Sequence, residues 1–260
     1  MAKLVDNARL LRTRDTDFSG FCDMQELSNP GYRSKPIHHI LEDYRKYGMP
    51  TTTIFFGDPL AFSLAREAIL ISPNTVNISS IGCSSGEEPY SFVAANLDLS
   101  DRVSVNGYDV NPNSIEKARK GKYNYGGEFF RDAGILPGTI YQADTEGLLT
   151  LSKSFKQLVT FQTHDISQEP LPEKQDIIFL LNVLQWYAAL GREEALSNIR
   201  DSLSEKGMLI CESRPVKPTG DISPYYWWME DLTSFGFGTV PAKYGHSYDK
   251  PICTQAYYKL

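Results

Sequence analysis

The sequence has 260 residues, of which 41% are hydrophobic and 22% are charged, and its formal net charge is −6. This composition is typical of a globular protein, and its acidic balance argues against broad nucleic-acid binding, which needs a basic face. The longest apolar stretch, 177–190, is interrupted by Asn182 and Gln185 and is shorter than the about 20 residues of a membrane span, so we expect no membrane insertion.

The cysteines and the first residues bear on the compartment. The four cysteines are scattered, with no paired spacing of the kind that metal ligands show. We therefore expect no metal site, and free thiols in a reducing, cytoplasmic setting. The first six residues contain no long apolar core, so we expect no signal peptide.

The first half of the chain divides at about residue 50. Residues 1–50 carry few apolar runs and one predicted helix, about 36–47, so we expect a short helical N-terminal segment there and the main domain over 51–260. Asp58 and Pro59 predict the start of a helix with an apolar face.

From residue 76 onward, predicted strands and helices alternate. We expect strands at 76–81, 103–108, 158–162, 176–181, 208–211 and 252–258, and helices at 87–96, 112–121 and 192–203. Gly207 is expected to stop the last of these helices, and residues 122–157 are less regular and are a candidate insertion. The alternation predicts an α/β fold with a doubly wound, mostly parallel sheet and helices on both faces, whose ligand site lies beyond the carboxyl ends of the strands.

The loop between the first strand and its helix is glycine-rich. Gly82 and Gly86 let a ligand approach the backbone, and Ser85 and Glu88 have the S-x-x-E spacing of a capping box. A dinucleotide loop usually has a middle glycine, which is missing here, and Glu87 and Glu88 would repel a pyrophosphate and attract a cation. S-adenosylmethionine carries an ammonium and a sulfonium and no phosphate, so the loop favours that cofactor.

A carboxylate ends the second strand. Asp109 follows Gly86 by 23 residues, and an acid about 20 residues after such a loop is placed to accept the ribose hydroxyls. The alternative is that the loop only caps a helix and that Asp109 only forms a turn.

Residues 80–91, SIGCSSGEEPYS, closely resemble the cofactor loop of the chemotaxis-receptor methyltransferases, the bacterial CheR type. Four further segments resemble that family in the right order: 55–59 with Phe62, 115–123, 182–184 and 207–213. The resemblance covers about residues 50–215. It implies a class I methyltransferase, Rossmann-like fold with S-adenosylmethionine as cofactor and S-adenosylhomocysteine as product.

The resemblance also implies roles for individual residues. Thr53 and Glu87 would contact the amino-acid end of the cofactor, Asp109 the ribose, Asp165 and Ile166 the adenine, and Asn182 and Val183 the floor of the site, with Gly82 and Ser84 in the loop. In the family, the methyl acceptor is a glutamate side chain of a membrane chemoreceptor.

The sequence departs from the family where an acceptor would bind. Gly57 and Leu181 stand where the family has arginine, so two donors that could clamp an anion are missing. Trp186 stands where the family has a tyrosine near the methyl group. Trp186 and Tyr187 are therefore candidates to line the methyl site, and no catalytic base is assigned.

A second aromatic cluster, 225–228, contains Tyr226 and Trp227, which either contact a small substrate or pack in the core. Three hypotheses follow. The first is a methyltransferase that acts on an oxygen, in particular a carboxylate, of a small molecule. The second is a protein-glutamate methyltransferase of a chemotaxis-like system. The third is a non-catalytic module that binds the cofactor or a partner. The oligomeric state is left open.

Overall fold

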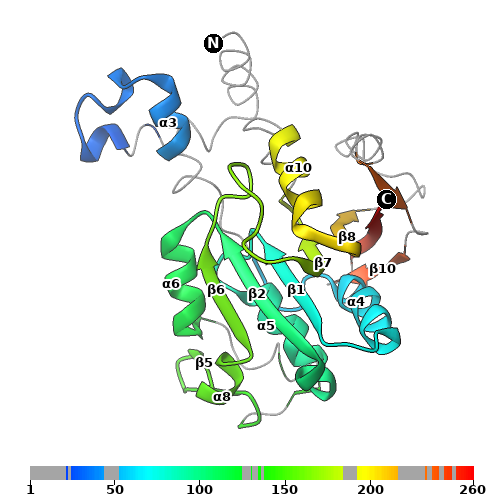
Figure 1. Cartoon of the computed structure of the whole chain (residues 1–260). Coiled ribbons are helices and arrows are strands. Elements are labelled where there is room, and N and C mark those ends of the chain that lie inside the picture. The colour runs from blue at the N-terminus through cyan, green and yellow to red at the C-terminus, as the bar shows by residue number, and fades with distance from the viewer. Residues whose placement is uncertain are drawn as a thin grey trace.

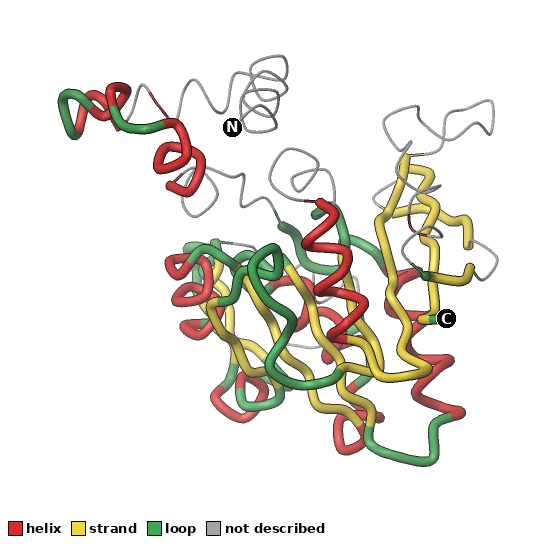
Figure 2. The backbone as a smooth tube through the Cα atoms, turned by 45° about the horizontal axis from the view of Figure 1, so that its top comes forward, coloured by secondary structure: helices red, strands yellow, loops and turns green. Residues whose placement is uncertain are grey.

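The structure is a computed structural model, and its described residues include most of the predicted main domain. They are residues 22, 25–43, 53–124, 130, 134–135, 138–183, 192–215, 232, 236–239, 243–247 and 250–260. Figures 1 and 2 show a central sheet with helices packed around it.

The central sheet has the order β10-β11-β8-β7-β1-β2-β6, with β9 paired to β11. Its strands are β1 (Val76–Ile81), β2 (Val103–Asp109), β6 (Val159–Thr163), β7 (Gln175–Leu180), β8 (Leu203–Pro215), β9 (Phe237–Thr239), β10 (Lys243–Ser247) and β11 (Lys250–Lys259). The five strands from β6 to β8 are parallel, and β9, β10 and β11 pair antiparallel. The doubly wound, mostly parallel sheet is thus confirmed, and strand order reverses beside β1, where such folds bind ligands.

The helices begin and end at recognisable sequence positions. The main ones are α4 (Pro59–Ile71), α5 (Glu87–Ala95), α6 (Pro112–Lys120) and α10 (Arg192–Ser202), and the shorter ones are η1 (Tyr32–Ser34), α3 (Ile37–Asp43), η3 (Leu97–Arg102) and α8 (Lys153–Lys156). Asp58 caps α4, Asn111 caps α6, and Gly121 ends α6 at a φ of 59°. Asp and Asn are favoured at helix N-caps, and Gly is favoured at the left-handed position that ends a helix. Helix α3 covers part of the predicted helix at 36–47, whose last four residues lie outside the described residues.

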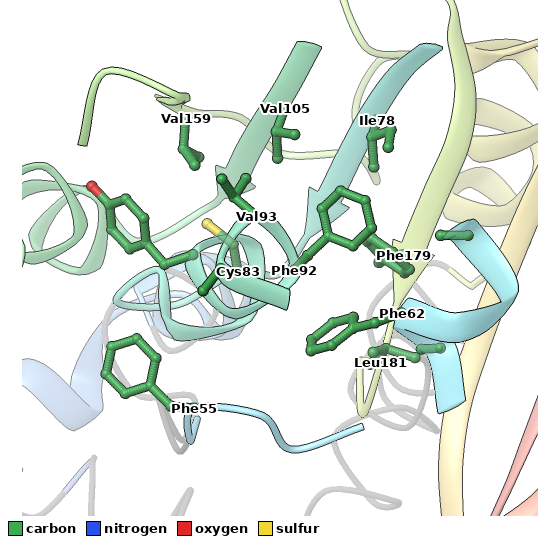
Figure 3. Packing of buried hydrophobic residues seen from close by; sticks show 14 of the residues in the cluster. Phe55, Phe62, Ile78, Cys83, Phe92, Val93, Val105, Val159, Phe179 and Leu181 are labelled. Carbon is green, nitrogen blue, oxygen red and sulfur yellow. The ribbon is translucent and has the colours of Figure 1, made fainter. Parts of the chain in front are cut away.

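Alternate residues of the strands supply two separate cores. Ile78 of β1 and Phe179 of β7 belong to one buried cluster together with residues of α4, α5 and α6 (Figure 3). Ile81 and Ile178, which point the other way, belong to a second cluster with residues of α10. Because both faces of β7 are buried, its last four residues, 177–180, are all apolar, as is typical of parallel strands between helices. β1 is buried on both faces too, but it contains the buried serines Ser79 and Ser80.

Residues 122–157 carry a second, antiparallel sheet of order β3-β5-β4. Its strands are β3 (Lys122–Tyr123), β4 (Tyr141–Ala143) and β5 (Leu149–Leu151). Aromatic rings join it to the segment before α4: the Phe55 ring lies 4.9 Å from that of Tyr123 and 4.7 Å from that of Phe130. The small sheet therefore packs beside the region where the family resemblance begins.

One predicted boundary is wrong. Gly207 does not stop a helix, because α10 ends at Ser202 and the chain is already in β8 from Leu203. A Cβ at Gly207 would lie 2.9 Å from a Leu203 side-chain carbon and 3.0 Å from the carbonyl oxygen of Gln175. Gly207 is needed for this close packing within the sheet.

Candidate functional site

The loop after β1 is wrapped tightly against the end of β2. The amides of Gly82 and Cys83 both donate to the carbonyl oxygen of Tyr108, at 2.8 and 3.0 Å. Gly82, Ser84 and Gly86 have φ values of 71°, 49° and 91°, so three of five consecutive residues are left-handed. Glycine adopts this conformation without steric cost, which explains two of the three positions.

Two contacts close the loop from the sides. A Cβ at Gly82 would lie 2.6 Å from the Val183 side chain, so this residue, three positions after the end of β7, packs directly on the loop. The Tyr123 hydroxyl of the small sheet donates to the carbonyl oxygen of Ser85 at 2.8 Å. The expected loop residues Gly82 and Ser84 and the expected floor residue Val183 are thus neighbours.

The predicted capping box is wrong. The N-cap of α5 is Gly86, which has no side chain to accept a hydrogen bond. Instead, the Ser85 hydroxyl donates to Oε1 of Glu87 at 3.1 Å, and the Ser80 hydroxyl donates to Oε1 of Glu88 at 2.8 Å. The S-x-x-E spacing is present, but both side chains bond elsewhere.

Glu87 places a buried carboxyl group at the head of α5. Its side chain is 3% exposed, and its Oε2 atom has no hydrogen-bond partner among the described residues. Burial raises the pKa of Glu87 to about 7, against the lowering effects of the Ser85 hydrogen bond and of Lys117. A buried carboxylate oxygen without a partner is costly, and a cationic ligand would offset that cost.

Glu88 has a structural setting of a different kind. Burial raises its pKa to about 8, with a further rise from the charge of Asp58, while the Ser80 hydrogen bond lowers it. Asp58 is also buried, and both of its carboxylate oxygens accept from the Thr254 hydroxyl of β11, at 3.0 and 2.9 Å. Glu88 and Asp58 therefore tie α5, α4 and the last strand to the sheet behind the loop.

Asp109, the expected ribose ligand, contacts the loop directly. Its Oδ2 accepts from the Ser84 amide and its Oδ1 from the Asn111 amide, both at 2.8 Å. Burial raises the pKa of Asp109 and the two amides oppose that rise. A carboxylate oxygen has a second lone pair, so each Oδ atom keeps acceptor capacity for a hydroxyl.

The remaining expected residues follow the neighbouring strands. Asp165 lies after β6 and accepts from the Ser167 amide and hydroxyl, at 3.1 and 2.7 Å. The Ile166 side chain is buried in the second core cluster together with Val183. Asn182 follows β7, is exposed and has a left-handed φ of 61°.

Sequence reasoning missed a connection in front of α5. The Ser91 hydroxyl accepts from the Phe56 amide at 2.9 Å, which joins α5 to the segment that contains Thr53. Phe56, Ser84 and Asn182 are the non-glycine residues with positive φ in the described part of the chain, and all three border this site. Such backbone strain tends to concentrate at functional sites, and it could have been found only from coordinates.

Four aromatic candidates lie outside the described part of the chain, and Cys83 lies within it. Trp186, Tyr187, Tyr226 and Trp227 lie outside the described residues. Cys83 is buried, its Sγ would lie 3.0 Å from a Cβ at position 107, and burial raises its thiol pKa, so it packs within the loop.

Two searches of the described residues concern metals and membranes. They contain no cluster of three or more His, Cys, Asp or Glu side chains that could hold a metal ion. Among the helices that these residues form, none has both the length and the apolar character needed to cross a bilayer.

The residues present fit S-adenosylmethionine. The unpartnered Oε2 of Glu87 suits an ammonium, and the Asp109 carboxylate suits a pair of hydroxyls. The same loop does not fit a pyrophosphate, because the buried Glu87 carboxyl stands at the head of α5, where a phosphate would need free amide donors.

Comparisons with known proteins agree with this chemistry. A family model described as the SAM binding domain of CheR methyltransferases matches residues 51–213. The methyltransferase Cher3 of Pseudomonas putida is 25% identical over 181 residues, which are 65% of each chain. A chemotaxis protein methyltransferase of Vibrio parahaemolyticus is 26% identical over 173 residues, 61% of this chain and 62% of that protein. This chain thus spans less than two thirds of the length of these relatives.

Among solved structures, the magnesium protoporphyrin IX methyltransferase of Synechocystis aligns with 95% of this chain and 98% of its own, at 14% identity and a TM-score of 0.49. The family match confirms the resemblance inferred from the loop. It also confirms the expected cofactor, because the matched region is a SAM binding domain.

Proposed function

The chain belongs to the family of CheR methyltransferases, and from this premise we propose that it transfers a methyl group from S-adenosylmethionine to a carboxylate of a protein. The observation that carries the proposal is the Glu87 carboxylate, buried at the head of α5 with its Oε2 unpartnered among the described residues. A cation beside this carboxylate would offset the cost of burying it, and the cofactor carries an ammonium at its amino-acid end.

We assign the cofactor-holding roles by position around the loop. Glu87 and Thr53 would hold the amino-acid end, and Asp109 the ribose hydroxyls. Asp165 and Ile166 would flank the adenine, with the Ile166 contact made by its backbone since its side chain is in the core. Asn182 and Val183 would form the floor beside Gly82 and Ser84.

Methyl transfer requires the protein mainly to position the cofactor and the acceptor. When bound, S-adenosylmethionine supplies an electrophilic methyl carbon on a sulfonium. A carboxylate acceptor is already a nucleophile, so the chain has to hold the two reactants in line and to keep the acceptor ionised, and needs no general base. The ring nitrogen of His164, which follows β6, lies 3.1 Å from the carbonyl oxygen of Glu169 and is given no catalytic role.

The relatives favour a protein acceptor. One of them is named a chemotaxis protein methyltransferase and another a biofilm formation methyltransferase, and neither name indicates a small molecule. The small-molecule hypothesis depended on the arginines missing at Gly57 and Leu181 and on aromatic residues outside the described part of the chain. We therefore propose a glutamate in a signalling protein as the acceptor, in a reducing compartment that keeps the cysteines as thiols.

The proposal can be tested with methyl-labelled S-adenosylmethionine and a soluble fragment of a chemoreceptor signalling domain. We expect label in the fragment that is released as methanol by mild alkali, as a methyl ester requires, and no label when the acceptor glutamates are changed to alanine. Base-stable label, or label only in a small-molecule extract, contradicts the protein-carboxylate assignment. Binding of S-adenosylhomocysteine without any transfer would favour the non-catalytic module.

A further inference from the structure

The hydroxyl of Ser91 connects two parts of the candidate site. Ser91 is 0% exposed, and its hydroxyl donates to the carbonyl oxygen of Glu87 at 2.6 Å, one helical turn earlier. The same oxygen accepts from the Phe56 amide at 2.9 Å. One side chain thus bonds both the first residue of α5 and the segment before α4, which lie 31 positions apart in the sequence.

The segment held in this way also packs through its two phenylalanine rings. Phe55, labelled in Figure 3, is fully buried, and its ring packs against Tyr123 of the small sheet and against Phe130. The next residue, Phe56, has a left-handed φ of 56°, which is strained for an aromatic side chain. Strained backbone persists when its surroundings over-determine it, and the bond from the Phe56 amide to Ser91 is one such restraint.

We propose that Ser91 is a positioning residue that sets where Thr53 stands relative to Glu87, and so sets the affinity for the cofactor. The inference rests on the proposed function, because it assumes that Thr53 and Glu87 both contact the amino-acid end. Without the hydroxyl, the Phe56 amide loses its buried acceptor and the strained turn can relax. Thr53 is three residues before that turn and would move away from Glu87.

The chain offers a closely matched control in Ser202. This residue is 1% exposed, its hydroxyl donates to the Asn198 carbonyl one turn earlier at 2.6 Å, and it accepts from the Leu171 amide at 2.8 Å. The two serines therefore make the same pair of bonds at nearly the same distances. Ser202 is at the end of α10, on the other face of the sheet, and contacts no residue of the candidate site in these bonds.

The experiment compares Ser91→Ala with Ser202→Ala by thermal unfolding and by calorimetric titration of S-adenosylhomocysteine. Both variants should unfold at lower temperature by a similar amount. Only Ser91→Ala should weaken binding, by about fivefold or more, the scale of one lost hydrogen bond. Ser91→Thr keeps the hydroxyl and should restore much of the affinity. Ser91→Cys keeps the volume of the site and serves if the alanine variant does not fold. Its expected loss is smaller, since a thiol is a weaker hydrogen-bond partner.

A second variant, Thr53→Ala, tests the route of the effect. If Ser91 acts through the segment that contains Thr53, then Thr53→Ala weakens binding in the wild type and has little further effect beside Ser91→Ala. Additive losses, or equal affinities of Ser91→Ala and Ser202→Ala, overturn the positioning role while the wild type still binds. Failure of the wild type itself to bind overturns the proposed function and this inference with it.

Discussion

Replacing Glu87 by glutamine should stabilise the ligand-free protein and weaken its binding of the cofactor. Burial raises the pKa of Glu87 from the ordinary 4.5 to about 7. One pKa unit corresponds to about 1.4 kcal/mol, so ionising this buried carboxyl costs the fold about 3 kcal/mol at pH 8. Glutamine has nearly the same shape and no charge, so the variant avoids this cost.

The pH dependence of the unfolding free energy gives the stability gain of Glu87→Gln a direction that can be checked. Because the folded pKa lies above the unfolded one, the folded state holds the extra proton between pH 4.5 and about 7, and stability falls as the pH rises through that window. The gain from Glu87→Gln should therefore be small near pH 4.5 and reach about 3 kcal/mol at pH 8. Removing the carboxylate also removes the expected partner of the cofactor ammonium.

The assay is urea unfolding at pH 5 and pH 8, paired with titration of S-adenosylhomocysteine at pH 8. Glu88→Gln is a matched control, because burial also raises the Glu88 pKa, to about 8, while its carboxylate accepts from Ser80. Glu88→Gln should show a pH-dependent gain in stability and retain the affinity for the ligand. The reasoning is refuted if Glu87→Gln is no more stable than the wild type at pH 8, or if it binds the ligand equally well.

The wild type should bind S-adenosylhomocysteine about tenfold more weakly at pH 6 than at pH 8, because Glu87 is mostly protonated below its pKa of about 7. Calorimetric titration at both pH values measures this difference, and equal affinities would contradict it. Asp109→Ala should weaken binding by about 1.5–3 kcal/mol, and an unchanged dissociation constant in a folded variant would remove the ribose assignment. Gly82→Ala should destabilise the fold by about 1–3 kcal/mol, because the residue has a φ of 71° and the new methyl would lie 2.6 Å from Val183; an unfolding midpoint equal to that of the wild type would exclude this packing. Asp58→Ala removes the cap of α4 and the bond to the last strand, and should lower the unfolding free energy by about 1–3 kcal/mol in a denaturant titration; no change would mean that this buried network contributes nothing.

Local patterns in the sequence were sufficient for most of the central sheet. The strand ending at Ile81, the helix starting at Glu87 and the helix between Asn111 and Gly121 all follow from apolar runs and from caps within a few residues. The proximity of Asp109 to the loop also followed, because the carboxyl ends of adjacent parallel strands share one edge of a sheet.

The sequence-based predictions failed where a side chain bonds to a residue that its local pattern does not contain. The capping box was wrong because Ser80, on the preceding strand, donates to Glu88. The bond of Ser91 to Phe56 and the bond of Asp58 to Thr254 join residues 35 and 196 positions apart, and no local pattern contains such pairs. The positive φ of Phe56, a residue type that disfavours this conformation, is likewise a product of tertiary packing.

The bond between Asp58 and Thr254 has a consequence for the order in which the protein folds. It closes a loop of almost two hundred residues, and such closures are entropically costly and slow compared with the pairing of β1 with β2. The glycine loop and its neighbouring strands can therefore assemble early, while α4 receives its full restraint only after β11 has entered the sheet between β8 and β10. In refolding experiments, protection of the Gly82 and Cys83 amides should precede protection of the Ala61 amide at the start of α4.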